Sequence, residues 1–147
     1  MSKSRFYPVL LTLTIVALLS MIWAPLVTRA QEPEKKFRVA YIVKMGDNPW
    51  FVTEARGIQE VADANGVELT VQDVKLDPAL AMDAVDQAIG TGVDGIIIVV
   101  PDQKIGPAVL KKAAEANIPV VTIDDYIYDS EGKQAPFVGF FAPDIGR

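Results

Sequence analysis

The most constraining feature of this sequence is a regular alternation of short apolar runs with longer segments of helical periodicity. The apolar runs are typical of strands, and they cover residues 37–44, 67–74, 95–100, 119–124 and 137–141. Between them, apolar residues recur at the spacing of an amphipathic helix, over about 50–65, 78–89 and 104–117. Strands that alternate with helices over short connections indicate βαβ units. The sequence therefore predicts an α/β fold, a doubly wound parallel sheet with helices on both faces.

The expected helix starts carry recognisable capping residues. Asn48 precedes Pro49, and Asp77 precedes Pro78. Each pair combines a side chain that caps a helix with a proline that suits the first helical turn. Asp102 is expected to cap the third helix in the same way.

The helical periodicity also predicts which side chains face the sheet. Phe51 falls on the inward stripe of the first helix, whereas Trp50 lies off it. Phe51 is therefore expected in the core, and Trp50 at a functional surface. In the second helix, Met82, Val85 and Ile89 form the inward stripe.

The amino-terminal segment, residues 1–30, differs from the rest of the chain. Lys3 and Arg5 precede a long apolar run, and the small residues Thr28 and Ala30 stand at the two positions that a signal peptidase reads. This pattern predicts a signal peptide cleaved after Ala30, and hence a periplasmic protein that touches a membrane only through this transient segment. An uncleaved membrane anchor is the alternative. Pro8, Pro25 and the length of the apolar run between them leave it open, since a stable span needs about 20 apolar residues.

Composition excludes several classes of function. The chain has 147 residues, with no cysteine and no histidine. It therefore forms no disulfide, no zinc site of Cys and His, and no Ser-His-Asp triad. No phosphate-binding glycine pattern follows any strand, so no nucleotide is expected.

The charge of the chain also limits its partners. Of 14 basic residues, three (Lys3, Arg5 and Arg29) lie in the first 30 positions, which hold none of the 19 acidic residues. The remaining chain thus has 11 basic and 19 acidic residues, a net charge of −8. Nucleic acid and anionic membrane surfaces require clustered Lys and Arg. We therefore expect no nucleic-acid partner.

Polar and aromatic residues follow the ends of two predicted strands. Lys44, Asn48 and Trp50 follow the first strand, and Asp124 and Asp125 follow the fourth. In open parallel sheets, ligands bind outside the carboxyl ends of the strands. Sugars present hydroxyl groups, which need donors and acceptors, and patches of C–H groups, which stack on aromatic rings. The pattern predicts a carbohydrate-binding site at this edge of the sheet.

Each of these residues also has a structural explanation. Asp124 and Asp125 could cap the turn that follows the fourth strand. Lys44 could be the solvated end of the first. Their shared position at one edge of the predicted sheet favours ligand contact.

Three segments carry a resemblance to a known family. "AYIVKMGDNPWF", "GIIIVVPDQKIG" and "VVTIDD", together with the signal peptide, resemble the periplasmic sugar-binding proteins of ABC transporters, and within them the L-arabinose-binding subgroup. The likeness covers residues 37–147. It implies the type I periplasmic binding protein fold, two α/β lobes that close on a sugar. By position it suggests as sugar contacts Lys44, Trp50, Asp124 and Asp125, with Phe140 lining the pocket.

Two departures from this subgroup leave the identity of the sugar open. Asn48, counted here among the sugar-binding residues, stands where the arabinose-binding proteins tend to have an acid, and Phe140 where they tend to have methionine. The family also has a second lobe of similar size. We therefore interpret residues 31–36 as a polar leader and residues 37–147 as a partial amino-terminal lobe, truncated before the second.

The resemblance implies a binding protein rather than an enzyme. We expect the solute-binding component of an ABC importer, with L-arabinose or a similar pentose or hexose as ligand. Its partners would be the monosaccharide and, in a full-length protein, the permease subunits. No cofactor or metal is expected. A binding protein that reports its ligand to a chemoreceptor or sensor kinase is the alternative.

Overall fold

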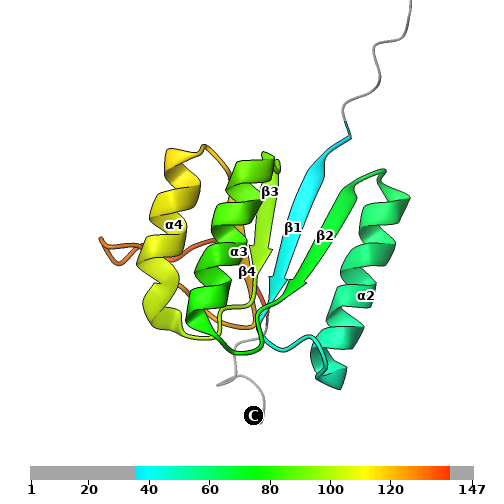
Figure 1. The fold of residues 1–147 in the computed structure, drawn as a ribbon, viewed down its shortest axis with the longest axis horizontal. Coiled ribbons are helices and arrows are strands. Elements are labelled where there is room, and N and C mark those ends of the chain that lie inside the picture. Colours follow the sequence, from blue (N-terminus) through cyan, green and yellow to red (C-terminus); the bar gives the residue numbers. More distant parts are fainter. Residues whose placement is uncertain (1–35, 140–147) are drawn as a thin grey trace, which may run out of the picture. The chain divides into compact units, whose positions relative to one another are not determined.

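A computed structural model shows the fold of residues 36–139. The predicted signal peptide, nearly all of the polar leader, and Phe140 lie outside these described residues. Five strands form one sheet in the order β2-β1-β3-β4-β5, and each pair of neighbours is parallel (Figure 1). This architecture confirms the predicted α/β fold.

The elements follow the predicted order. The strands are β1 (Arg38–Val43), β2 (Glu68–Asp73), β3 (Gly95–Ile98), β4 (Val120–Ile123) and β5 (Phe137–Val138). The helices are α2 (Pro49–Ala64), α3 (Pro78–Thr91) and α4 (Gly106–Glu115), and a 3-10 turn, η1 (Gln103–Ile105), leads into α4. The predicted third helix thus begins as a tighter turn.

The caps form as the sequence indicates. The side-chain oxygen of Asn48 accepts a hydrogen bond from the backbone N–H of Trp50 at 2.9 Å. Asp77 caps α3 through the N–H of Ala79 at 2.7 Å, and Asp102 caps η1. These bonds satisfy backbone donors that a helix start leaves unpaired.

The end of α3 lies beyond the predicted position. The helix passes through Gly90 and ends at Gly92, whose φ of 69° is left-handed. A single glycine in a helix is tolerated, whereas the left-handed cap requires the freedom that glycine has. Gly92 therefore ends α3, and Gly90 does not.

The two faces of the sheet pack against different helices. Side chains alternate along β1: Ala40 and Ile42 join the core under α3 and α4, whereas Tyr41 and Val43 join the core under α2. Figure 1 shows α3 and α4 together on one side of the sheet and α2 on the other. Helices on both faces were predicted, and the structure confirms them.

The face that carries α2 is incompletely covered. The helix packs against β2 at one edge of the sheet. Over the other strands, Ile97 and Ile123 are only partly buried, and Val138 of β5 is 58% exposed. A groove of about 560 Å³, here called the α2 groove, runs between α2 and β5, and Trp50 stands at its wall.

No helix in residues 36–139 combines the length and the apolar character that a membrane crossing needs.

Candidate functional site

The fold brings the predicted site residues to one edge. β1 and β4 each pair with β3, so their carboxyl ends flank the end of that strand. Lys44 follows β1 directly, and Asp124 and Asp125 follow β4 directly. Trp50 lies in the first turn of α2, which begins five residues after Lys44. The prediction that these four side chains share an edge is met by the geometry.

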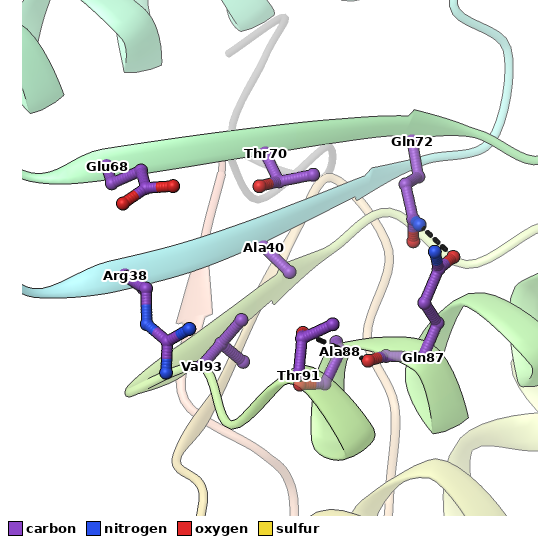
Figure 2. Close-up of a pocket in the computed structure, with 9 residues that line it drawn as sticks. All are labelled: Arg38, Ala40, Glu68, Thr70, Gln72, Gln87, Ala88, Thr91 and Val93. Atoms are coloured by element: carbon purple, nitrogen blue, oxygen red, sulfur yellow. Dashed lines mark hydrogen bonds between the residues drawn. The ribbon is translucent and has the colours of Figure 1, made fainter.

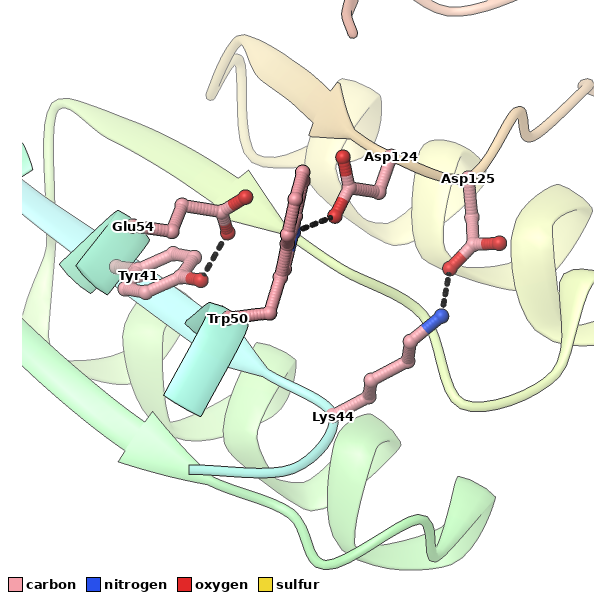
Figure 3. A network of polar contacts seen from close by, with 6 residues as sticks. All are labelled: Tyr41, Lys44, Trp50, Glu54, Asp124 and Asp125. Carbon is pink, nitrogen blue, oxygen red and sulfur yellow. Dashed lines mark hydrogen bonds and ion pairs between the residues drawn. The ribbon is translucent and has the colours of Figure 1, made fainter. Parts of the chain in front are cut away.

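Lys44 and Asp125 form an ion pair across this edge (Figure 3). Their side chains are 22% and 25% exposed, so solvent screens the pair only in part. The Lys44 ammonium also lies 5.5 Å from the centre of the Phe51 ring. Phe51 itself is buried, as the helical stripe predicts.

Trp50 and Asp124 form a second link across the same edge. The indole Nε1–H donates to Asp124 Oδ2 at 2.7 Å. Trp50 remains 54% exposed. An indole that is fixed by its N–H and half exposed can offer its ring to the C–H surface of a ligand.

The turn after β4 directs the two adjacent carboxylates apart. Asp124 has a φ of 62°, in the left-handed region that few residues other than glycine, Asn and Asp adopt. Its N–H donates to the carbonyl oxygen of Val138 at 3.2 Å, and the N–H of Asp125 donates to that of Ile123 at 2.6 Å. In consequence Asp124 reaches Trp50 on α2, while Asp125 reaches Lys44 (Figure 3).

Asn48 is occupied by its capping role. Its side-chain oxygen accepts from the Trp50 N–H, and its Nδ2 lies 3.7 Å from the sulfur of Met45. The cap fixes the start of the helix that carries Trp50. Contact of Asn48 with a sugar stays a prediction, and Phe140 lies outside the described residues.

Two residues of this region were not predicted from the sequence. The hydroxyl of Tyr41, a fully buried residue of β1, donates to the carboxylate of Glu54 on α2. Burial raises the pKa of Tyr41, and the bond to Glu54 raises it further. One signal points to Glu54: it follows Trp50 by four residues, and residues with this spacing lie on the same face of a helix.

The ionisation of Glu54 reflects several neighbours. Burial raises its pKa above the ordinary value. The hydroxyl of Tyr41 opposes this shift, the charge of Asp124 adds to it, and Lys44 opposes it. Glu54 thus belongs to the electrostatic environment of the candidate site.

The chemical character of the edge suits a neutral polyhydroxylated ligand. Lys44 offers a donor, Asp124 and Asp125 offer acceptors, and Trp50 offers an aromatic face. Within residues 36–139, no cluster of three or more His, Cys, Asp or Glu side chains could hold a metal ion.

A second hollow lies away from this edge. It is a polar cavity of about 240 Å³ between β1, β2 and α3, where Arg38, Thr70 and Thr91 line the wall and Gln72 is hydrogen-bonded to Gln87 (Figure 2). None of the predicted site residues lines it. The edge at Lys44 and Trp50 therefore remains the candidate functional site.

Comparison with known proteins identifies the family. Residues 39–147 match the periplasmic binding protein domain. The chain belongs to this family, which confirms the resemblance seen in the sequence. Its relatives are binding proteins of ABC transporters rather than enzymes, as predicted.

The relatives in sequence include two arabinose-binding proteins. The chain is 33% identical over 142 residues to an ABC transporter L-arabinose-binding periplasmic protein of Azospirillum brasilense, an alignment that covers 91% of this chain and 41% of that protein. It is 30% identical to the L-arabinose-binding periplasmic protein of Escherichia coli, over 77% of this chain and 35% of that protein. The chain thus spans less than half the length of either relative.

Solved structures show the same kinship. An ABC transporter solute-binding protein of Burkholderia multivorans superposes with a TM-score of 0.63 at 31% identity, over 71% of this chain and 40% of that one. The arabinose-binding component of a Shewanella ABC transporter, bound to L-arabinofuranose, gives 0.56 at 28% identity, over 61% of this chain and 30% of that one. The described residues thus have the fold of one lobe of such proteins.

Proposed function

We propose that this chain supplies one wall of a monosaccharide-binding site in the periplasmic component of an ABC importer. The proposed ligand is L-arabinose, or a pentose or hexose of similar shape, because two of the relatives are L-arabinose-binding proteins. Permease subunits are the proposed protein partners of the whole binding protein.

One observation supports this proposal above the others. Two independent links, Lys44 to Asp125 and Trp50 to Asp124, cross the carboxyl edge of the sheet at neighbouring positions. Each link holds a group that a sugar uses, a charged acceptor or an aromatic face, in a fixed direction before any ligand arrives. Preorganised groups of this kind reduce the ordering cost of binding.

The proposed roles follow from the chemistry of each side chain. Asp124 and Asp125 accept hydrogen bonds from sugar hydroxyls, and such charge-assisted bonds are stronger than neutral ones. Lys44 donates to a ring or hydroxyl oxygen. The indole of Trp50 stacks on the C–H face of the sugar.

The wall by itself should bind weakly. Pockets of high affinity typically enclose about 70% or more of their ligand. A sugar on a single wall keeps its other side in water. We therefore expect a dissociation constant no better than roughly millimolar for residues 31–147, equivalent to about −4 kcal/mol.

Substitution at the edge tests the site. Trp50→Ala and Asp124→Ala should each reduce the binding of L-arabinose by about 1–3 kcal/mol, because the first removes the stacking face and the second a charged hydrogen-bond acceptor. Calorimetric titration with L-arabinose, galactose, ribose and xylose measures the loss.

Matched controls lie away from the edge. Asp83 is an exposed acid on α3, and Tyr128 is a half-exposed aromatic residue. Asp83→Ala and Tyr128→Ala should bind like the parent chain. If the variants at Trp50 and Asp124 also bind like the parent, this edge is not the sugar site.

Export is proposed together with the function. Cleavage after Ala30 would release a periplasmic chain that begins at Gln31. Intact-mass measurement of periplasmic protein checks this. A product that retains Met1 and sediments with membranes would contradict it.

A further inference from the structure

The bond between Tyr41 and Glu54 lies beside the candidate site and joins β1 to α2. It acts on α2, the helix that carries Trp50. α2 buries only Phe51 and Ala62, whereas the shorter α3 buries four residues. The orientation of α2 therefore depends more on individual polar contacts than that of α3 does.

The geometry gives this bond a specific effect on the site. Tyr41 is fully buried in the middle of β1, so its hydroxyl is a fixed point. Glu54 binds that hydroxyl from one helical turn beyond Trp50. From the same part of α2, Trp50 reaches across to Asp124 at 2.7 Å. In the view of Figure 3, the indole stands between the carboxyl groups of Glu54 and Asp124.

We infer that Glu54, held by Tyr41, is a positioning residue that orients the Trp50 indole toward Asp124, and that the protonation of Glu54 changes the surroundings of the indole. Its consequence for sugar affinity rests on the proposed function. The orienting effect itself does not, because it acts on the unliganded chain.

Among the described residues, three titratable groups from other elements face Glu54. They are Tyr41 of β1, Lys44 after β1 and Asp124 after β4. Glu54 and Asp124 both line the α2 groove, where burial raises the pKa of Glu54 above its ordinary value of 4.5. Once Glu54 ionises, it adds a negative charge near the indole, and at lower pH this charge is lost.

The fluorescence of Trp50 reports this ionisation without any ligand. The chain has two tryptophans, so all variants are made in a Trp23→Phe background, where Trp50 is the only one. The emission should titrate with a midpoint above 4.5. Glu54→Gln should abolish the titration, whereas Glu60→Gln, at an exposed acid on the same helix, should leave it unchanged.

Measurements of sugar affinity distinguish the positioning role of Glu54 from the effect of its charge. Tyr41→Phe removes only the hydroxyl and should weaken L-arabinose binding about 2- to 10-fold, the value of one hydrogen bond. Glu54→Gln keeps an oxygen that accepts from Tyr41, so its affinity should stay within about 2-fold of the parent. Tyr128→Phe is the matched control and should bind like the parent.

The outcomes distinguish the inference from the proposed function. If neither parent nor variants bind sugar even far above the roughly millimolar range, but the emission of Trp50 titrates through Glu54, the proposed function fails and the positioning role stands. If the emission does not titrate above 4.5, or still titrates in Glu54→Gln, the inference is wrong. Parent-like emission and affinity in Tyr41→Phe would also overturn it.

Discussion

The two faces of the sheet differ in how completely they are covered, although both are built from the same strands. Within residues 36–139, sixteen buried residues form one continuous core under α3 and α4, while the core under α2 contains four. The difference begins within single strands: Ile98 faces the first core and is fully buried, whereas its neighbour Ile97 faces α2 and is partly exposed.

The candidate site lies on the less completely covered side of the sheet. The α3–α4 face supplies most of the apolar burial that stabilises the sheet. The α2 face holds its helix with fewer apolar contacts, and the polar links at Trp50 and Glu54 belong to that side. In this lobe, the candidate site lies beside the less extensive core.

The largest expected effect concerns the two neighbouring isoleucines of β3. Ile98→Ala should lower the free energy of unfolding by about 2–5 kcal/mol, because it opens a cavity in a close-packed core. Ile97→Ala should cost roughly 1 kcal/mol, since its side chain is only partly removed from water. Chemical denaturation of both variants measures the difference. Equal losses would show that the two faces are equally well packed.

A smaller effect should follow from adding a methyl group at the start of α4. A Cβ at Gly106 would lie 2.8 Å from Cβ of Ile127, a fully buried residue that cannot easily move. Gly106→Ala should therefore destabilise the chain by about 1–3 kcal/mol. Thermal melting checks the prediction, and an unchanged melting temperature would mean that this face has spare room.

The same change on α2 should have the opposite sign. A Cβ at Gly57 would meet nothing within 4 Å. Gly57→Ala should therefore stabilise the chain by about 0.5–1 kcal/mol, because alanine loses less backbone freedom in a helix than glycine does. The same melting experiment measures this gain, and a loss instead would show that something covers the α2 groove in solution.

The smallest expected effect concerns Asp73, the last residue of β2. Asp73 accepts hydrogen bonds from the N–H groups of Gly46 at 2.9 Å and Lys75 at 3.0 Å, and these bonds lower its pKa below 3.8. A lowered pKa stabilises the fold above pH 3.8, and this contribution disappears as the pH falls through the folded-state value. The exposed Asp73 should contribute less than about 1 kcal/mol.

The free energies of unfolding of Asp73→Asn and of the parent should be compared between pH 7, where carboxylates are ionised, and pH 2. The stability difference should shrink at the acid end. A difference that is independent of pH would indicate that the charge of Asp73 has no part in holding the loop at Gly46.

Much of the fold could be predicted because local signals and the global arrangement agree. Asn48, Asp77 and Asp102 cap the turns that their positions indicate, and the parallel sheet follows from the alternation of elements. Phe51 is core and Trp50 is exposed, as the stripe of the first helix predicts.

The interior of α3 shows where periodicity loses accuracy. The stripe predicted Met82, Val85 and Ile89 on the inward side, but only Val85 is fully buried, and the other two pack at the border of the core. The remaining buried positions of α3 are alanines: Ala81, Ala84 and Ala88. Hydrophobicity alone underrates alanine, which is buried here because the helix lies close to the sheet.

The sequence predicted that four of the candidate side chains share one edge, but not how they pair. These side chains are Lys44, Trp50, Asp124 and Asp125. The sequence could not show that Lys44 would pair with Asp125 and Trp50 with Asp124. That choice depends on the left-handed turn at Asp124, which sequence spacing does not reveal. Glu54 was missed because its partner, a tyrosine hydroxyl inside an apolar strand, is recognisable only once the strand and helix are placed together.

The left-handed backbone at Asp124 has a consequence for engineering and for natural drift. A residue other than glycine in this conformation stores of order 1 kcal/mol or more of strain. Glycine would release that strain, so a search for more stable variants should select Asp124→Gly. The same change removes the carboxylate that holds Trp50. At this position the variant that resists heat best is expected to be one that has lost the link to Trp50, and stability screens of this lobe should leave position 124 fixed.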